Sequence, residues 1–140
     1  MTDDERRAQA AMRALQTLER RHEQFLAHIT SEADLAVIGG SVTTDGQTLT
    51  ATTLGVSCTA TRRPIAVDAH PVANEYTFFT QFGGEELPIW RLFLDQHGHL
   101  FEDSALGVRF GDFDGAYVRA NIVVALANKL LQSPVFAPSA

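Results

Sequence analysis

The sequence of 140 residues contains very little cysteine and very little lysine. Cys58 is the single cysteine, so an intrachain disulfide cannot form and a zinc site built on several cysteines is excluded. Lys129 is the only lysine, and arginine supplies the other cations, a bias that arginine-rich codon usage would explain. No apolar run approaches the roughly 18 residues that are needed to cross a bilayer. We therefore expect neither a disulfide scaffold nor a contact with the membrane.

Motifs of catalysis and phosphate binding are also missing. The sequence has no nucleophile elbow of the form G-x-S-x-G, no phosphate-binding loop and no dinucleotide fingerprint. The doublets Gly39-Gly40 and Gly83-Gly84 lack the Lys-Ser or Lys-Thr that follows in a phosphate loop, so they indicate turns. The sequence therefore predicts no catalytic residue.

The charge balance narrows the choice of partners. The net charge is −6, and the cations are scattered where a protein that binds phosphate backbones would show a basic stripe. Nucleic acid is therefore not expected as a partner. The chain opens with Met-Thr-Asp-Asp-Glu, without the basic start and apolar run of a signal peptide, so a cytoplasmic location is expected. The length and the apolar fraction of 45% are typical of one globular domain, residues 1–140.

Residues 3–30 are predicted to form one long helix with a continuous apolar stripe. The stripe follows alternating spacings of three and four residues, and comprises Ala8, Ala11, Leu15, Leu18, His22, Phe25 and Ile29. The predicted helix that carries it, residues 3–30, would be about 40 Å long, which is more than a sheet of this chain's size would cover. The helix can lie across a sheet, and we expect it also to pair with a second copy of itself.

Between residues 35 and 110 the apolar period changes to two, which predicts an antiparallel sheet of about six to eight strands. A first short strand is expected at residues 35–38. Asp45-Gly46 is a strong signal for a two-residue hairpin turn. The alternation then slips near residues 53–55, which predicts a bulge or a tight turn there. Arg62-Arg63-Pro64 is expected to be a connection between strands.

The second half of this β-rich segment contains an aromatic strand and a hairpin. Residues 76–82 alternate so that Tyr76, Phe78 and Phe82 share one face and Phe79 lies on the other. Aromatic side chains on both faces mean that something covers each of them, either both helices or a second subunit. A hairpin is expected around residues 95–98, with Gly98 in the left-handed conformation.

The chain is expected to close with a strand at 106–110, a helix at 113–132 and a short tail. Asp112 or Asp114 could cap this helix, and Pro134 ends it. Because no helices alternate with the strands, a doubly wound parallel sheet is excluded. The predicted class is α+β, an antiparallel sheet flanked by an N-terminal and a C-terminal helix.

A group of histidines and the single cysteine could take part in chemistry, but a simpler interpretation fits each of them. His97 and His99 lie near Glu102, yet Arg91 stands where the glycine of a cupin-like metal motif belongs, and the carboxylate is too close to the second histidine. No metal site is expected. Cys58 alternates with apolar neighbours, which indicates a small core residue and not a nucleophile.

Arg119 breaks the pattern of the final helix. At 100° per residue, Leu126 and Leu130 lie within about 20° of it, so the arginine projects from the middle of the apolar face. Its guanidinium must reach solvent, pair with a carboxylate such as Asp68 or Glu75, or meet an anionic ligand. The sequence leaves all three interpretations open.

These observations favour a non-catalytic, homo-oligomeric binding protein that associates through the N-terminal helix, a sheet face or both. A small anionic, nucleotide-like ligand is the preferred binding partner, because Arg119, Arg109 and Arg91 could supply charge and Trp90 a stacking surface. One alternative is a protein-interaction module of the immunity-protein or chaperone type. Another is a small enzyme whose site is assembled from scattered residues. No cofactor is expected.

Overall fold

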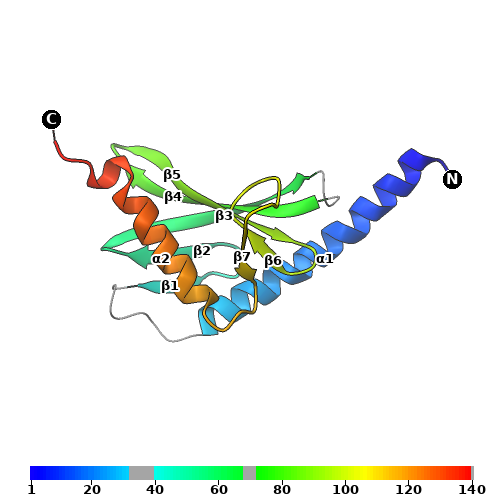
Figure 1. Ribbon diagram of the computed structural model, residues 1–140, viewed down its shortest axis with the longest axis horizontal. Coiled ribbons are helices and arrows are strands. Elements are labelled where there is room, and N and C mark those ends of the chain that lie inside the picture. Colours follow the sequence, from blue (N-terminus) through cyan, green and yellow to red (C-terminus); the bar gives the residue numbers. More distant parts are fainter. Residues whose placement is uncertain (32–39, 68–71, 140) are drawn as a thin grey trace.

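The computed structural model describes residues 1–31, 40–67 and 72–139. Within these residues the chain forms a helix, a seven-stranded antiparallel sheet and a second helix (Figure 1). The predicted α+β class is therefore confirmed. The helices are α1 (Asp3–Ser31) and α2 (Val118–Leu131), and a 3-10 turn, η2 (Pro134–Phe136), follows α2. The strand predicted at 35–38 lies outside the described residues.

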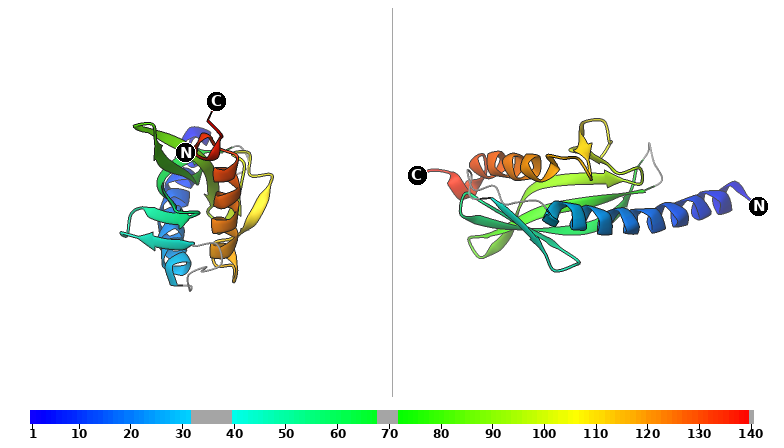
Figure 2. Two further views of the ribbon diagram at one scale, coloured as in Figure 1. Left: turned by 90° about the vertical axis from the view of Figure 1, so that its left-hand side faces the viewer. Right: turned by 90° about the horizontal axis from the view of Figure 1, so that it is seen from below.

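The seven strands pair in the order in which they occur along the chain, β1-β2-β3-β4-β5-β6-β7, and all neighbouring pairs are antiparallel. Their bounds are β1 (Ser41–Thr44), β2 (Leu49–Thr53), β3 (Val56–Ala66), β4 (Val72–Phe82), β5 (Glu85–Asp95), β6 (His99–Phe101) and β7 (Arg109–Asp112). The longest strands, β3, β4 and β5, form the centre of a curled sheet (Figure 2).

Turns connect these strands where they were predicted, but the β1–β2 connection comprises four residues, 45–48, and not two, because Thr44 pairs with Leu49. In the β1–β2 turn, Asp45 Oδ1 accepts hydrogen bonds of 2.8 Å from the backbone N–H groups of Gln47 and Thr48. Between β2 and β3, Leu54 and Gly55 have φ angles of 54° and 75°. Two consecutive positive φ angles are those of a type I′ hairpin turn. The slip in the alternation near residues 53–55 is thus a tight turn.

The prediction that Arg62-Arg63-Pro64 is a connection is wrong, because β3 runs through all three residues. Arg63 pairs with Glu75 and Pro64 with Asn74 of β4. The pairing of β3 with β2 ends at Ala60, so beyond that point β3 has β4 as its only strand neighbour among the described residues. A proline, which has no N–H to donate, is tolerated on such an edge.

Both helices pack on the same, concave face of the sheet. The residues of β4 and β5 that face them, Tyr76, Phe78, Trp90 and Leu92, belong to one core cluster with Phe25 of α1 and with Ile122 and Leu126 of α2. The cluster also contains Cys58, which is completely buried as predicted. Because neither helix lies on the convex face, the interpretation that the two helices sandwich the sheet is wrong.

The convex face carries a smaller apolar cluster at one end. Ala73, Phe93, Phe101 and Leu106 are buried there, and Ile65 and Val67 pack against them. Leu106 belongs to the segment between β6 and β7 and has a φ angle of 56°. Strand β7 therefore begins at Arg109 and not at residue 106 as predicted.

The C-terminal helix also begins later than predicted. Tyr117 is its N-cap residue, and no side chain caps it, so the predicted caps Asp112 and Asp114 are wrong. Asp112 is the last residue of β7, and its carboxylate contacts neighbouring strand residues.

Among the described residues, no helix is long and apolar enough to cross a membrane.

Helix α1 extends well beyond the sheet (Figures 1 and 2). Its buried residues begin at Ala14 and continue with Leu18, His22, Phe25, Leu26 and Ile29. Residues 1–10 are all exposed. Met12 and Leu15, which belong to or flank the predicted stripe, are 62% and 40% exposed. The expectation that the sheet is too small to cover the stripe is confirmed.

Candidate functional site

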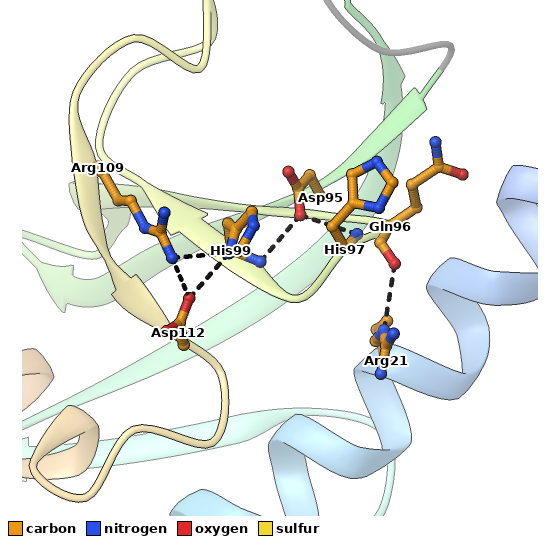
Figure 3. A network of polar contacts seen from close by, with 7 residues as sticks. All are labelled: Arg21, Asp95, Gln96, His97, His99, Arg109 and Asp112. Carbon is orange, nitrogen blue, oxygen red and sulfur yellow. Dashed lines mark hydrogen bonds and ion pairs between the residues drawn. The ribbon is translucent and has the colours of Figure 1, made fainter.

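A network of polar contacts surrounds the turn between β5 and β6 (Figure 3). Asp95, which is fully buried, accepts hydrogen bonds from the backbone N–H groups of His97, at 3.0 Å, and His99, at 2.9 Å. Arg21 of α1 donates from Nε to the carbonyl oxygen of Gln96 at 3.1 Å. The turn is therefore shaped by Asp95 and tied to the N-terminal helix.

Gly98 completes this turn. It has a φ angle of 85°, the left-handed conformation predicted for it. The ring of Phe113 lies so close that a Cβ added at residue 98 would be 2.6 Å from it. The guanidinium of Arg21 lies over the same ring, 5.4 Å from the Phe113 centroid. Glycine is thus required at position 98 by its conformation and by its close neighbour.

Arg109, a predicted ligand residue, is held by its neighbours in β6 and β7. Its Nη2 lies 2.5 Å from Asp112 Oδ1 and 2.9 Å from His99 Nδ1. His99 Nδ1 is also 2.8 Å from Asp112 Oδ1. A proton on Nδ1 would be donated to Asp112, whereas an unprotonated Nδ1 would accept from Arg109, so the two contacts of His99 require different tautomers.

The trio formed by His99, Arg109 and Asp112 is a charged and partly exposed group of side chains. Hydrogen bonds from His99 and Arg109 lower the pKa of Asp112, which therefore stays ionised. The side chains of His99, Asp112 and Arg109 are 37%, 47% and 53% exposed. In the part of the chain that the structure describes, no group of three or more His, Cys, Asp or Glu residues is arranged to hold a metal ion. The trio thus links β6 to β7 through charged and polar contacts, and we call this group of three residues the clasp.

Arg119 lies in the concave core, as its position on the apolar face of α2 predicted. It is 2% exposed, and its Nη2 is 3.5 Å from the carbonyl oxygen of Val42 in β1. Of the two carboxylates considered as its partner, Glu75 points to the convex face and pairs with Arg63 at 3.4 Å. Asp68 lies outside the described residues. The guanidinium is therefore shielded from solvent, which rules out the interpretation that it reaches water.

Polar contacts fix the middle of α1 to β4. His22 Nδ1 lies 2.8 Å from the hydroxyl oxygen of Tyr76, and both residues are buried. Burial lowers the pKa of His22 and raises that of Tyr76, since it disfavours both charged forms. Asn74 Nδ2 donates to the carbonyl oxygen of Leu18 at 3.3 Å. The place of His22 in the stripe is thus explained by a partner within the same chain.

A groove of about 830 Å³ lies along β5 on the convex side of the sheet. Its floor contains Ile89 and Phe93, and its walls carry charged side chains from five parts of the chain. The charged residues are Arg63 (β3), Glu75 (β4), Arg91 (β5), Glu102 and Asp103 (after β6) and Lys129 (α2). The groove is therefore a polar, mixed-charge site with an apolar floor.

The structure brings only two of the four predicted ligand residues to this groove. Arg91 lines it, and Trp90 borders it although its ring is packed in the core against Phe78 and Phe110. Arg119 lies in the concave core, and Arg109 is engaged in the clasp with Asp112. The four residues thus do not form one site. Trp90 is 7% exposed, which leaves its faces unavailable for stacking on a ligand.

Two cations of the groove were not predicted as ligand residues. Arg63 was not predicted as a ligand residue because residues 62–64 were interpreted as a connection between strands. Its side chain lies on the face of β3 opposite to the core, as the side chain of Arg91 does in β5. Lys129 reaches the groove from α2, and no sequence spacing relates a residue of that helix to a strand. The alternation of side chains along β3 was the one feature of the sequence that could have pointed to Arg63.

Cys58 has no feature of a reactive thiol. It is completely buried among core residues, and burial raises its pKa to about 11. A thiol with such a pKa is almost entirely protonated at neutral pH and is a poor nucleophile.

Comparison with protein-family models, with curated proteins and with solved structures finds no match to this chain.

Proposed function

We propose that this chain is a non-catalytic binding protein that associates with a second copy of itself through the N-terminal half of α1. The observation that carries the proposal is the continuity of the apolar stripe past the edge of the sheet. Leu18, His22 and Phe25 are at most 3% exposed, whereas Leu15, in the same stripe, is 40% exposed. A regular apolar surface that projects from the body is typical of a surface that docks on another protein.

A second copy of α1 fits this surface in an antiparallel arrangement. The first turn of the helix is acidic, with Asp3, Asp4 and Glu5, and Arg13 follows about two to three turns later. Antiparallel pairing places the acidic turn of one helix beside the arginines of its partner. Parallel pairing would place two acidic turns side by side. Charge and helix dipole thus favour the antiparallel dimer.

The size of the surface indicates a modest affinity. The projecting residues 3–13 extend about 16 Å at 1.5 Å per residue. A contact of a few helical turns is smaller than the roughly 1,600 Å² of a standard stable interface. We therefore expect a dimer with a micromolar dissociation constant, unless the bodies of the two copies add to the contact.

Sedimentation velocity of the whole chain from 1 to 200 µM tests the proposal. The expected result is a species of twice the 15.3 kDa chain mass that grows with concentration. Leu15→Glu should weaken the dimer by more than 100-fold, because a buried leucine is worth about 1.5–3 kcal/mol and a symmetric interface contains it twice. A monomer over the whole range would contradict self-association and favour a different protein as the partner of α1.

Ala10→Glu is a matched control for this variant. Ala10 is exposed and lies about 140° around the helix from Leu15, and the substitution adds the same charge to the same segment. It should leave the dissociation constant within about threefold of the parent. Equal weakening by both variants would show that the added negative charge, and not the apolar stripe, controls association.

A further inference from the structure

The groove on the convex face lies beside a free edge of the sheet. Strand β6 pairs with β5 only at Phe93 and Leu94. Among the described residues, the preceding half of β5, from Glu85 to Arg91, therefore has a strand neighbour on one side only. Lys129 of α2 and Ser104, after β6, border the groove there. The groove thus opens along a stretch of β5 that the fold leaves uncovered.

Three cations and three carboxylates line the groove, and they differ in whether they have partners within the chain. Arg63 and Glu75 form an ion pair of 3.4 Å. The carboxylate of Asp103 accepts hydrogen bonds of 2.7 to 3.1 Å from the backbone N–H groups of Gly107 and Val108, which stabilise its charge. The other charged side chains of the lining are two cations, Arg91 and Lys129, and one carboxylate, Glu102. Arg91 and Lys129 are thus the cations of the groove that are not held in the ion pair of Arg63 with Glu75.

Both of these cations are open to a ligand. They are exposed, and neither forms an ion pair or a side-chain hydrogen bond within residues 1–31, 40–67 and 72–139. A guanidinium can bind a carboxylate or phosphate through two parallel hydrogen bonds, and an ammonium adds a mobile second charge. Arg91 and Lys129 are therefore suited to hold one anionic group between a strand and a helix.

The remaining lining of the groove specifies the rest of the ligand. Pro88 and Ile89 present apolar surface beside Arg91, and Phe93 closes the floor. Pro88 has no N–H, so this edge lacks a donor that an added peptide strand would need, and edge prolines discourage such pairing. The lining therefore fits a compact molecule with an apolar body better than an extended peptide.

We propose that the groove binds a small aromatic anion, with its carboxylate, phosphate or sulfonate held by Arg91 and Lys129 and its ring against Pro88 and Ile89. This deepens the proposed function by giving the binding protein a class of ligand. It shares no residue with the association surface on α1, which packs on the opposite side of the sheet. Either proposal can therefore fail without the other.

The probe for the test is 8-anilinonaphthalene-1-sulfonate, an aromatic sulfonate whose fluorescence rises in an apolar site. Its uncharged analogue N-phenyl-1-naphthylamine serves as the comparison. We expect saturable binding of the sulfonate at one site per chain, with at least tenfold weaker binding of the uncharged analogue. Arg91→Gln and Lys129→Gln should each raise the dissociation constant of the sulfonate at least tenfold. Arg20→Gln, which removes an exposed cation of α1, is the matched control and should change it less than twofold.

Amide spectra of the ¹⁵N-labelled chain locate the probe independently. The signals of residues 88–93 should shift on addition of the sulfonate, and those of residues 3–15 should not. Displacement by AMP or by benzoate then distinguishes a phosphate from a carboxylate ligand. The proposal is overturned if the sulfonate does not bind, if Arg91→Gln and Lys129→Gln bind it as the parent does, or if Leu15→Glu alone abolishes binding. The last result would place the probe on the α1 stripe.

Discussion

The two halves of α1 have the same apolar pattern but different surroundings. In the second half, Phe25 and Ile29 are completely buried against the sheet, and His22 contacts Tyr76. In the first half, Met12 is 62% exposed and residues 1–10 are all exposed, because this end of α1 extends beyond the strands (Figure 1). A heptad pattern therefore predicts that a helix has an apolar side. How much of that side is buried within the chain depends on the length of the sheet.

The largest difference between the halves should appear in the free energy of unfolding. Phe25 is 0% exposed and packs edge-on against Tyr76, with ring centroids 5.4 Å apart. Phe25→Ala should lower the free energy of unfolding by about 3–5 kcal/mol, because it leaves a cavity between α1 and β4. Urea denaturation followed by circular dichroism measures this change. A loss below 1 kcal/mol would mean that the second half of α1 is not part of the core.

His22 should make the packed half sensitive to acid. Burial is the main cause of its lowered pKa, so below the ordinary value of 6.5 the unfolded chain binds a proton more readily than the folded chain does. This contribution to stability is therefore complete above about pH 6.5 and decreases as the pH falls. We expect a loss of at most about 1 kcal/mol between pH 6.5 and pH 5.5, since one pKa unit corresponds to 1.36 kcal/mol.

Replacing the ring tests that assignment. His22→Gln cannot be protonated, so thermal melts of this variant should show a smaller loss of stability between pH 6.5 and pH 5.5 than the parent does. The variant should also be less stable than the parent at pH 7.5, because it loses the stacked contact with Tyr76, whose centroid is 5.7 Å away. An unchanged pH dependence would assign the acid sensitivity to another group.

The ion pair between Glu19 and Arg62 should contribute less. Its atoms are 2.6 Å apart, but the glutamate side chain is 52% exposed, and such pairs are worth at most about 1 kcal/mol. Glu19→Gln should therefore lower the free energy of unfolding by 1 kcal/mol or less, and the loss should shrink in 1 M salt. Glu23→Gln is the matched control, since Glu23 is an exposed residue of the same helix. A loss above 2 kcal/mol for Glu19→Gln would identify the pair as a principal anchor of α1.

The smallest effect on stability is expected from the projecting half. Deletion of residues 1–11 removes only residues that are exposed or half-buried, so the free energy of unfolding should stay within about 0.5 kcal/mol of the parent. The same deletion should abolish the concentration-dependent dimer in sedimentation. If the truncated chain were instead less stable by 2 kcal/mol, the first half of α1 would have to contact the body of its own chain.

Much of the fold could be predicted because its determinants are local. The heptad spacing located α1, and Asp45-Gly46 and Gly98 located turns whose backbone angles only a few residue types adopt readily. The errors arose where a long-range contact overrides a local signal. Pro64 reads as a break in a strand, but β4 pairs with it from one side. Asp112 reads as a helix cap, but Arg109 and His99 bind its carboxylate.

The proposed ligand residues were harder to predict for the same reason. The anomaly of Arg119 is visible in the helical periodicity, and the structure confirms that its side chain is buried. Nothing in the sequence shows that Lys129 and Arg91 border the same groove, because this depends on where α2 crosses the sheet. Trp90 was expected to be a stacking surface, yet the aromatic rings of Phe78 and Phe110 occupy its sides. A site whose residues come from elements distant in the sequence can be predicted only after the fold is known.

The order of the strands has a consequence for the synthesis of the chain. Each of the seven described strands pairs with its neighbour in sequence, so the sheet can be extended one hairpin at a time as the chain leaves the ribosome. Helix α1 emerges first, but His22 must wait for Tyr76, 54 residues later, before it finds its partner. At about 5–20 residues per second this delay is about 3–10 s. During this interval the nascent chain exposes the whole apolar stripe of α1, which makes it a target for chaperones and for pairing between chains on neighbouring ribosomes.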